Sequence, residues 1–402
     1  MVVSRRLERD RRDYVSSPMS GNDDSGIDIF AAVPSHLHVN CVIPQSLDDQ
    51  WIPESLVRHL LIERQSFDDV RDRHQIMIRS EYVRALLTSR QVVVNRTYLF
   101  RNPVISSDYT QGGDNREAFE QLLSQRALVP FLLKETSPLA TSDAGDPRFA
   151  DASRAWNAIC RQRPLYCVRL SWDDEKNDSL VDKLLFRAFA DGVRNASAAN
   201  IVEFLEDHPW ANPSRRTEDL RSRLTELQLI RRSLAAVPLT RTSLYEKFVV
   251  VDGTKAADRL YDPDKPFVGA IKSFLDLLYN SNLANALGKA LVTPTETLHR
   301  SALLEHPSGP VNMRWDAPAI MEVVQNALFT WNSKTEALRP FEGLTLAQVL
   351  GIRQSQTWID YADALDDLLR HPWKASHPDR GIPIMYKKYR ALLDQAVKSR
   401  LD

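Results

Sequence analysis

Three consecutive valines, Val92–Val94, constrain the fold more than any other feature of the sequence. A β-branched run of this kind is typical of a strand that is buried on both faces of a sheet. The chain continues through a helical stretch, 115–123, to a second apolar run, Leu128–Leu133. Because strand–helix–strand units usually form parallel, right-handed crossovers, the stretch Arg90–Leu133 predicts part of a parallel sheet. Pro130 interrupts the second run and predicts an edge strand or a bulge.

Most of the remaining chain shows helical periodicity. A third strand is expected at Leu165–Trp172, and a further short strand at 248–251. Helices are expected at 268–291, at 357–369, where the apolar spacing is most regular, and at 384–399. We therefore predict an α+β protein that is predominantly helical, with a small sheet region in the N-terminal part followed by a mainly helical C-terminal part.

The same patterns divide the chain into three parts. Residues 1–26 carry many charges and few large apolar side chains, so we expect a disordered charged tail. Residues 27–175 form the predicted α/β region, and residues 176–402 the mainly helical region. Within the α/β region, the segment 27–53 contains three prolines and is expected to be extended and irregular.

Composition narrows the setting in which the protein works. The net charge is −1, so no overall field attracts nucleic acid; a nucleic-acid partner remains possible only through a local patch. No apolar run approaches the roughly 18 residues that a membrane-spanning helix needs, so we expect no membrane partner. The chain has only 3 cysteines, which argues against a disulfide framework and for the cytoplasm.

An acidic cluster follows the third predicted strand and is the first candidate catalytic site. Asp173, Asp174 and Lys176 come directly after that strand. Carboxylates at a strand end can hold Mg²⁺, and a neighbouring lysine can stabilise the charge that develops in phosphodiester cleavage. These residues predict a metal-dependent hydrolase acting on nucleic acid. The alternative without catalytic function is a polar loop that begins the next helix.

The loop after the valine strand is a candidate ligand site. Arg96, Arg101 and Asp108 lie in or near it, and ligands of open α/β sheets gather beyond the carboxyl ends of strands. The two arginines suit an anionic ligand, although ordinary loop polarity gives the same residues. Further upstream, His36, His38 and Cys41 have a spacing that could bring metal ligands together. No fourth ligand follows nearby, so we assign no metal site.

One short segment resembles half of the catalytic motif of the phospholipase D phosphodiesterases. The segment reads Tyr245-Glu-Lys-Phe-Val-Val-Val-Asp-Gly, in which Lys247 and Asp252 match the lysine and aspartate of the family. The family places its nucleophilic histidine where this chain has Tyr245. Without that nucleophile the resemblance implies an inactive half-site.

The helix expected at 357–369 carries four aspartates opposite its apolar side, at positions 360, 363, 366 and 367. With no second acidic helix to oppose them, we expect a solvated face and not a metal site. Phosphate-binding glycine loops are missing from the sequence, and no cofactor is indicated. The chemistry of the sequence does not decide whether the chain is an enzyme. We predict, first, an interaction or regulatory protein that binds a protein partner through a helical surface, and second, the nucleic-acid hydrolase described above.

Overall fold

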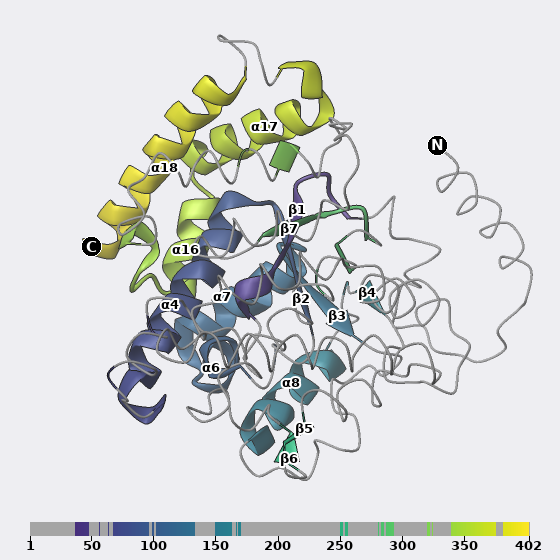
Figure 1. The fold of residues 1–402 in the computed structure, drawn as a ribbon, viewed down its shortest axis with the longest axis vertical. Coiled ribbons are helices and arrows are strands. Elements are labelled where there is room, and N and C mark those ends of the chain that lie inside the picture. The colour runs from purple at the N-terminus through teal and green to yellow at the C-terminus, as the bar shows by residue number, and fades with distance from the viewer. Residues whose placement is uncertain are drawn as a thin grey trace, which may run out of the picture.

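A computed structural model describes residues 37–47, 67–95, 102–132, 149–162, 339–374 and 381–401 of the chain, with shorter pieces near 56, 63, 99, 166–169, 250–255, 280–292 and 320–324. This part is mainly helical and contains a small parallel sheet, in line with the predicted α+β class (Figure 1). None of its helices is long and apolar enough to cross a bilayer. The charged tail 1–26 and the expected boundary at 175 lie outside the described residues.

The main sheet has five parallel strands in the order β4-β3-β2-β1-β7. Its strands are β1 (Cys41–Pro44), β2 (Gln91–Asn95), β3 (Leu128–Leu132), β4 (Val168–Arg169) and β7 (Ala290–Val292). Consecutive strands from β1 to β4 therefore step across the sheet in one direction, and β7 is added on the other side of β1. The expected parallel arrangement of the β2 and β3 runs is confirmed.

Both faces of the sheet are buried. Val92 and Val94 belong to the main hydrophobic core, whereas Val93, also 1% exposed, points to the opposite face because side chains alternate along a strand. Val42 and Ile43 divide between the two faces in the same way. This double burial explains why β2 can be an unbroken valine run: neither face has to meet water.

Helices from the connections between the strands pack together on the core face. They are α4 (Phe67–Thr88), α6 (Pro103–Thr110), α7 (Gly113–Ser124) and α8 (Ala150–Gln162). The apolar stripe expected within 115–123 is buried as predicted, and Phe119 packs against Tyr109 and Trp156. Ring centroids in this aromatic cluster lie 5.0–6.4 Å apart, close enough for tilted and edge-on contacts.

Three C-terminal helices complete the described core. They are α16 (Leu346–Arg353), α17 (Gln356–Arg370) and α18 (Ile382–Leu401). The helices expected at 357–369 and 384–399 are confirmed as α17 and α18, and α17 ends at His371-Pro372, since proline cannot continue a helix. Figure 1 shows α16 beside α4 and α7, with α17 and α18 beyond one end of the strands.

Several elements differ from the sequence expectation. The segment expected to be irregular contains β1, and the helix expected to run to 291 stops early because Gly288 takes a positive φ of 61°. The amide of Lys289 then donates to the carbonyl of Ala284, a helix-ending bond that releases the chain into β7. The segment at 250–251 does form a strand, β5 (Val250–Val251), but it pairs with β6 (Thr254–Lys255) in a separate hairpin.

The prediction that Pro130 marks an edge strand or a bulge is wrong, because β3 lies between β2 and β4 and its register with β2 is unbroken through Pro130. The local geometry explains the error. Among the described residues, β4 pairs with Phe131 and Leu132, and Pro130 has a registered neighbour on the β2 side alone. A residue without an N–H is tolerated there for the same reason that it is tolerated at an edge.

Candidate functional site

Most of the residues expected to form a site lie outside the described part of the chain. This holds for the acidic cluster Asp173, Asp174 and Lys176, and for the loop arginines Arg96 and Arg101. It also holds for Tyr245, Lys247 and Asp252 of the segment that resembles the phospholipase D half-motif. The roles predicted for them therefore stay predictions.

Asp108 is the one member of these sets that the structure places. It lies on α6, 3% exposed, and its Oδ2 accepts a hydrogen bond from Arg79 Nη1 of α4 at 2.5 Å. Burial raises the pKa of the Asp108 carboxyl to about 6, an effect that the Arg79 charge and hydrogen bond oppose. This ion pair joins α6 to α4. The Arg79 guanidinium carbon also lies over the Tyr82 ring, 5.6 Å from the ring centroid.

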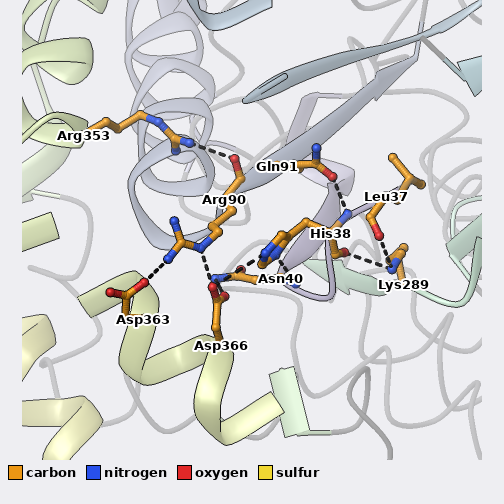
Figure 2. Close-up of polar contacts among 9 residues, drawn as sticks. All are labelled: Leu37, His38, Asn40, Arg90, Gln91, Lys289, Arg353, Asp363 and Asp366. Atoms are coloured by element: carbon orange, nitrogen blue, oxygen red, sulfur yellow. Dashed lines mark hydrogen bonds and ion pairs between the residues drawn. The ribbon is translucent and has the colours of Figure 1, made fainter. Parts of the chain in front are cut away.

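A denser polar cluster surrounds the amino ends of β1, β2 and β7 (Figure 2). Asp366 of α17 is its centre: one carboxylate oxygen accepts from Arg90 Nε and the other from Asn40 Nδ2 at 3.2 Å. Arg90 also donates to Asp363, one turn earlier on α17. On the far side of the cluster, Lys289 Nζ donates to the carbonyl of His38 at 2.9 Å. Four elements that are distant in the sequence thus meet at one edge of the sheet.

His38 lies at the middle of this cluster, with its Nδ1 hydrogen-bonded. Its Nδ1 accepts from the backbone amide of Asn40 at 3.1 Å, which leaves the proton of the neutral ring on Nε2. Nε2 lies 3.7 Å from Asp366 Oδ2. Burial lowers the pKa of His38, and Asp366 opposes this while Arg90 adds to it.

Cys41 is the third residue of the possible metal-ligand set His36, His38 and Cys41. His36 lies outside the described residues. The Cys41 side chain is 1% exposed, and burial raises the pKa of its thiol to about 12. A metal ligand must be the thiolate, which this environment disfavours. Among the described residues, no group of three or more His, Cys, Asp or Glu side chains could hold a metal ion.

The C-terminal end of α4 is a second place where the C-terminal helices contact the rest of the core, beside the polar cluster around Asp366. Arg353 of α16 donates to three carbonyls there, those of Leu86, Ser89 and Arg90, the last two at 2.8 and 2.7 Å. The carbonyls between them are also paired: Trp358 Nε1 donates to Leu87 O at 2.9 Å and Tyr361 OH to Thr88 O at 3.1 Å. Side chains from α16 and α17 therefore satisfy the carbonyls that every helix leaves open at its C-terminus.

The expectation of a fully solvated acidic face on α17 is wrong at one position. Asp360, Asp363 and Asp367 are partly or fully accessible, but Asp366 is 6% exposed and is used in the polar cluster. The signal was present, because Asp366 lies one turn from the buried Ala362 and Leu369. Arg90, Arg353 and Trp358 gave no such signal, since their partners are more than 260 residues away in sequence.

The outward side of α17 forms a second feature, which we call the α17 surface: Ile359, Asp360, Asp363, Arg370 and, in the short helix η7 (Pro372–Lys374), Trp373. Trp373 is 68% exposed and Ile359 36%. The Trp373 ring lies edge-on to His371 at 6.1 Å, and the Lys374 ammonium lies 5.5 Å from its centre. Lys374 in turn binds Asp367, so the tryptophan is displayed from an ordered helix end.

Lys374 also sets the ionisation of Asp367. Its hydrogen bond, with a smaller contribution from His371, lowers the pKa of that exposed carboxyl. The helix end that carries Trp373 is therefore fixed by a charge-assisted contact at neutral pH.

Comparison with known proteins adds no assignment to these features. The chain matches no protein-family model, and it matches neither the curated proteins nor the solved structures that were searched.

Proposed function

We propose that the protein acts by binding another protein through the α17 surface and performs no chemistry there. The observation that carries the proposal is the exposure of Trp373, 68% accessible on an ordered helix end. Tryptophan is among the residues most enriched at the energetic centres of protein interfaces, because it buries a large rigid area with few rotamers to fix. An exposed tryptophan on a solvated surface has an unfavourable area of contact with water that a partner would remove.

The exposed carboxylates of α17 favour a protein partner over a nucleic acid. Asp360 and Asp363 stand on the same outward side of α17, with side chains 51% and 66% exposed. Carboxylates repel phosphates, so a nucleic-acid backbone is a poor match for this side. A partner with an apolar slot for the indole and basic residues around it complements the surface.

The polar clusters of the described residues support a structural reading over a catalytic one. Asp366 and Arg353 are buried and are each held by partners inside the chain. A catalytic base or nucleophile has to be left accessible to substrate, whereas these groups tie α16 and α17 to the sheet.

The proposal is tested by recovering partners from cells with tagged wild-type protein, Trp373→Ala and Ile76→Ala. Ile76 is a suitable control because it is 50% exposed and lies on a different helix, α4. We expect at least one protein to be recovered with wild type and with Ile76→Ala, and to be lost by roughly thirtyfold with Trp373→Ala, which corresponds to an interface anchor worth about 2 kcal/mol. A photo-crosslinking residue placed at 373 should join the same protein. Equal recovery with all three proteins would remove the basis of the proposal.

A further inference from the structure

The strand order of the sheet points to a second candidate site, separate from the α17 surface. The chain moves from β1 to β2, β3 and β4 on one side of β1, whereas β7 lies on the other side. The direction in which strands are added therefore reverses between β1 and β7. In open parallel sheets, a crevice forms outside the carboxyl ends of the strands at such a switch point, and ligands bind there.

Two buried side-chain oxygens without a hydrogen-bond partner among the described residues lie at this place. The strand β1 ends at Pro44, and the one-turn helix η1 (Gln45–Leu47) follows it. Gln45 is 7% exposed and Ser46 1%. Gln45 Oε1 and Ser46 Oγ are both buried, and neither has a hydrogen-bond partner among the described residues. Buried polar groups are nearly always paired, so two unpaired neighbours at a switch point indicate a missing partner.

The backbone around these side chains is held in place. Asn102, fully buried, donates from Nδ2 to the carbonyl of Leu47 at 3.2 Å. Its Oδ1 accepts from the amide of Val104 at 3.0 Å and so caps α6. These bonds tie η1 to the start of α6, so Gln45 and Ser46 are presented from a fixed turn. A site that is already organised loses less entropy when a ligand binds.

The chemistry of the turn defines the ligand. Gln45, Ser46, Leu47 and Asn102 are all uncharged. A carboxamide offers a donor and an acceptor side by side, which matches a flat ligand edge with the same pair of groups. Nucleobases and carboxamides have such an edge, and the Ser46 hydroxyl can make a third bond.

We propose that Gln45 and Ser46, at the β1–β7 switch point, bind the hydrogen-bonding edge of an uncharged nucleobase or carboxamide ligand. This site lies at the carboxyl end of β1, and the contacts of α17 lie at its amino end. The two proposals therefore concern opposite edges of the sheet and stand or fall separately.

The test uses the full chain and three probes: adenine, cytosine and nicotinamide. Binding is followed by saturation-transfer NMR and titration calorimetry for wild type, Gln45→Met and Ser46→Ala. We expect at least one probe to bind wild type with a Kd below about 1 mM and at least tenfold more weakly to each variant. Each substitution removes an unpaired buried group, so the free variants should also melt higher, by about 2–4 °C.

Ser153→Ala is the matched control. Ser153 Oγ on α8 is also buried and has no partner among the described residues, so the substitution should raise the Tm in the same way. It should leave the Kd of the probe unchanged. The proposal is overturned if no probe binds wild type, if Ser46→Ala and Gln45→Met keep the wild-type Kd, or if Ser153→Ala weakens binding as much as they do.

Discussion

At the scale of single residues, Arg353 bears more of the structure than its position in the sequence suggests. Arg353 is 7% exposed. Its guanidinium donates to three carbonyls at the end of α4 and lies 4.3 Å from the ring centre of Trp358. Only arginine has a planar fork of donors that can serve several acceptors at once. Lysine at this position could bond one carbonyl well and would leave others unpaired.

Arg353→Ala should therefore lower the free energy of unfolding by about 3 kcal/mol or more, because buried acceptors left unpaired cost about 1–3 kcal/mol each. Arg353→Lys should fall between this variant and wild type. Arg116→Ala serves as the control, since Arg116 forms a partly exposed i,i+4 pair with Glu120 on α7 and such pairs contribute about 0.3–0.5 kcal/mol. Urea denaturation measures all three, and equal losses for Arg353→Ala and Arg116→Ala would contradict the assigned role.

Asp108 gives a prediction about pH at the same scale. Its folded pKa of about 6 lies above the unfolded value of 3.8, so folding disfavours the charged form. Stability from this group is present at low pH and is lost as pH rises from about 4 to about 6. The free energy of unfolding of Asp108→Asn, measured relative to wild type, should therefore increase over that range. A constant difference from pH 4 to pH 7 would show that the Arg79 contact holds the carboxyl charged throughout.

At the scale of elements, two neighbouring tyrosines separate hydrogen bonding from packing. The rings of Tyr361 on α17 and Tyr389 on α18 lie 6.1 Å apart, and both residues are fully buried. Tyr361 OH donates to Thr88 O, whereas Tyr389 OH has no hydrogen-bond partner in the described part of the chain.

Tyr361→Phe should lower the free energy of unfolding by about 1–2 kcal/mol, because it leaves the Thr88 carbonyl at the end of α4 unpaired. Tyr389→Phe should change it by less than about 0.5 kcal/mol or increase it, since no bond is lost and a buried hydroxyl is removed. Thermal unfolding of both variants side by side gives the comparison. If Tyr389→Phe proved the more destabilising of the two, the pairing described for α4 and α17 would be wrong.

The elements also show what can be read from the sequence. Val92–Val94 and the stripes of α7, α17 and α18 were predictable, because local periodicity reports burial directly. The short strands β1 and β7 were not, since three or four apolar residues become a strand only when a neighbour accepts them. α16 was also missed, although Thr345 and Gln348 form a capping box that the sequence displays.

The candidate sites depended even more on long-range contacts. Asp366 could have been placed near the buried side of α17 from its spacing, but nothing local indicated that Arg90 would meet it across 276 residues. Gln45 and Ser46 are ordinary polar residues in the sequence. They become notable only when the strand order and their burial are known.

At the scale of the whole molecule, the C-terminal helices and the sheet should unfold together. α16 and α17 satisfy the end of α4, and Arg90 and Asp366 join α17 to the strands. In native-state hydrogen exchange, we expect the amides of α17 and β2 to exchange with the same free energy, equal to that of global unfolding. Exchange from α17 at a clearly lower free energy would show that the helices open as a separate unit.

The interaction proposal also predicts what the whole protein does not do. Incubation with single- and double-stranded DNA and RNA, with Mg²⁺ or Mn²⁺, should leave the nucleic acid intact. Metal-dependent cleavage that Asp174→Ala abolishes would instead establish the hydrolase function predicted from Asp173, Asp174 and Lys176, and would replace the proposal.

The hydrogen bonds at the end of α4 also determine when, during synthesis, a new chain can complete its core. Ser89 and Arg353 are 264 residues apart, which at about 5–20 residues per second puts roughly 13–50 s of synthesis between them. During that interval α4 and the valine strand have left the ribosome while the side chains that complete them do not yet exist. In the meantime the carbonyls can bond to water, but the apolar residues that α16 and α17 later cover are exposed to solvent. Until α16 and α17 have been synthesised, this apolar surface is open to non-specific association with other apolar surfaces.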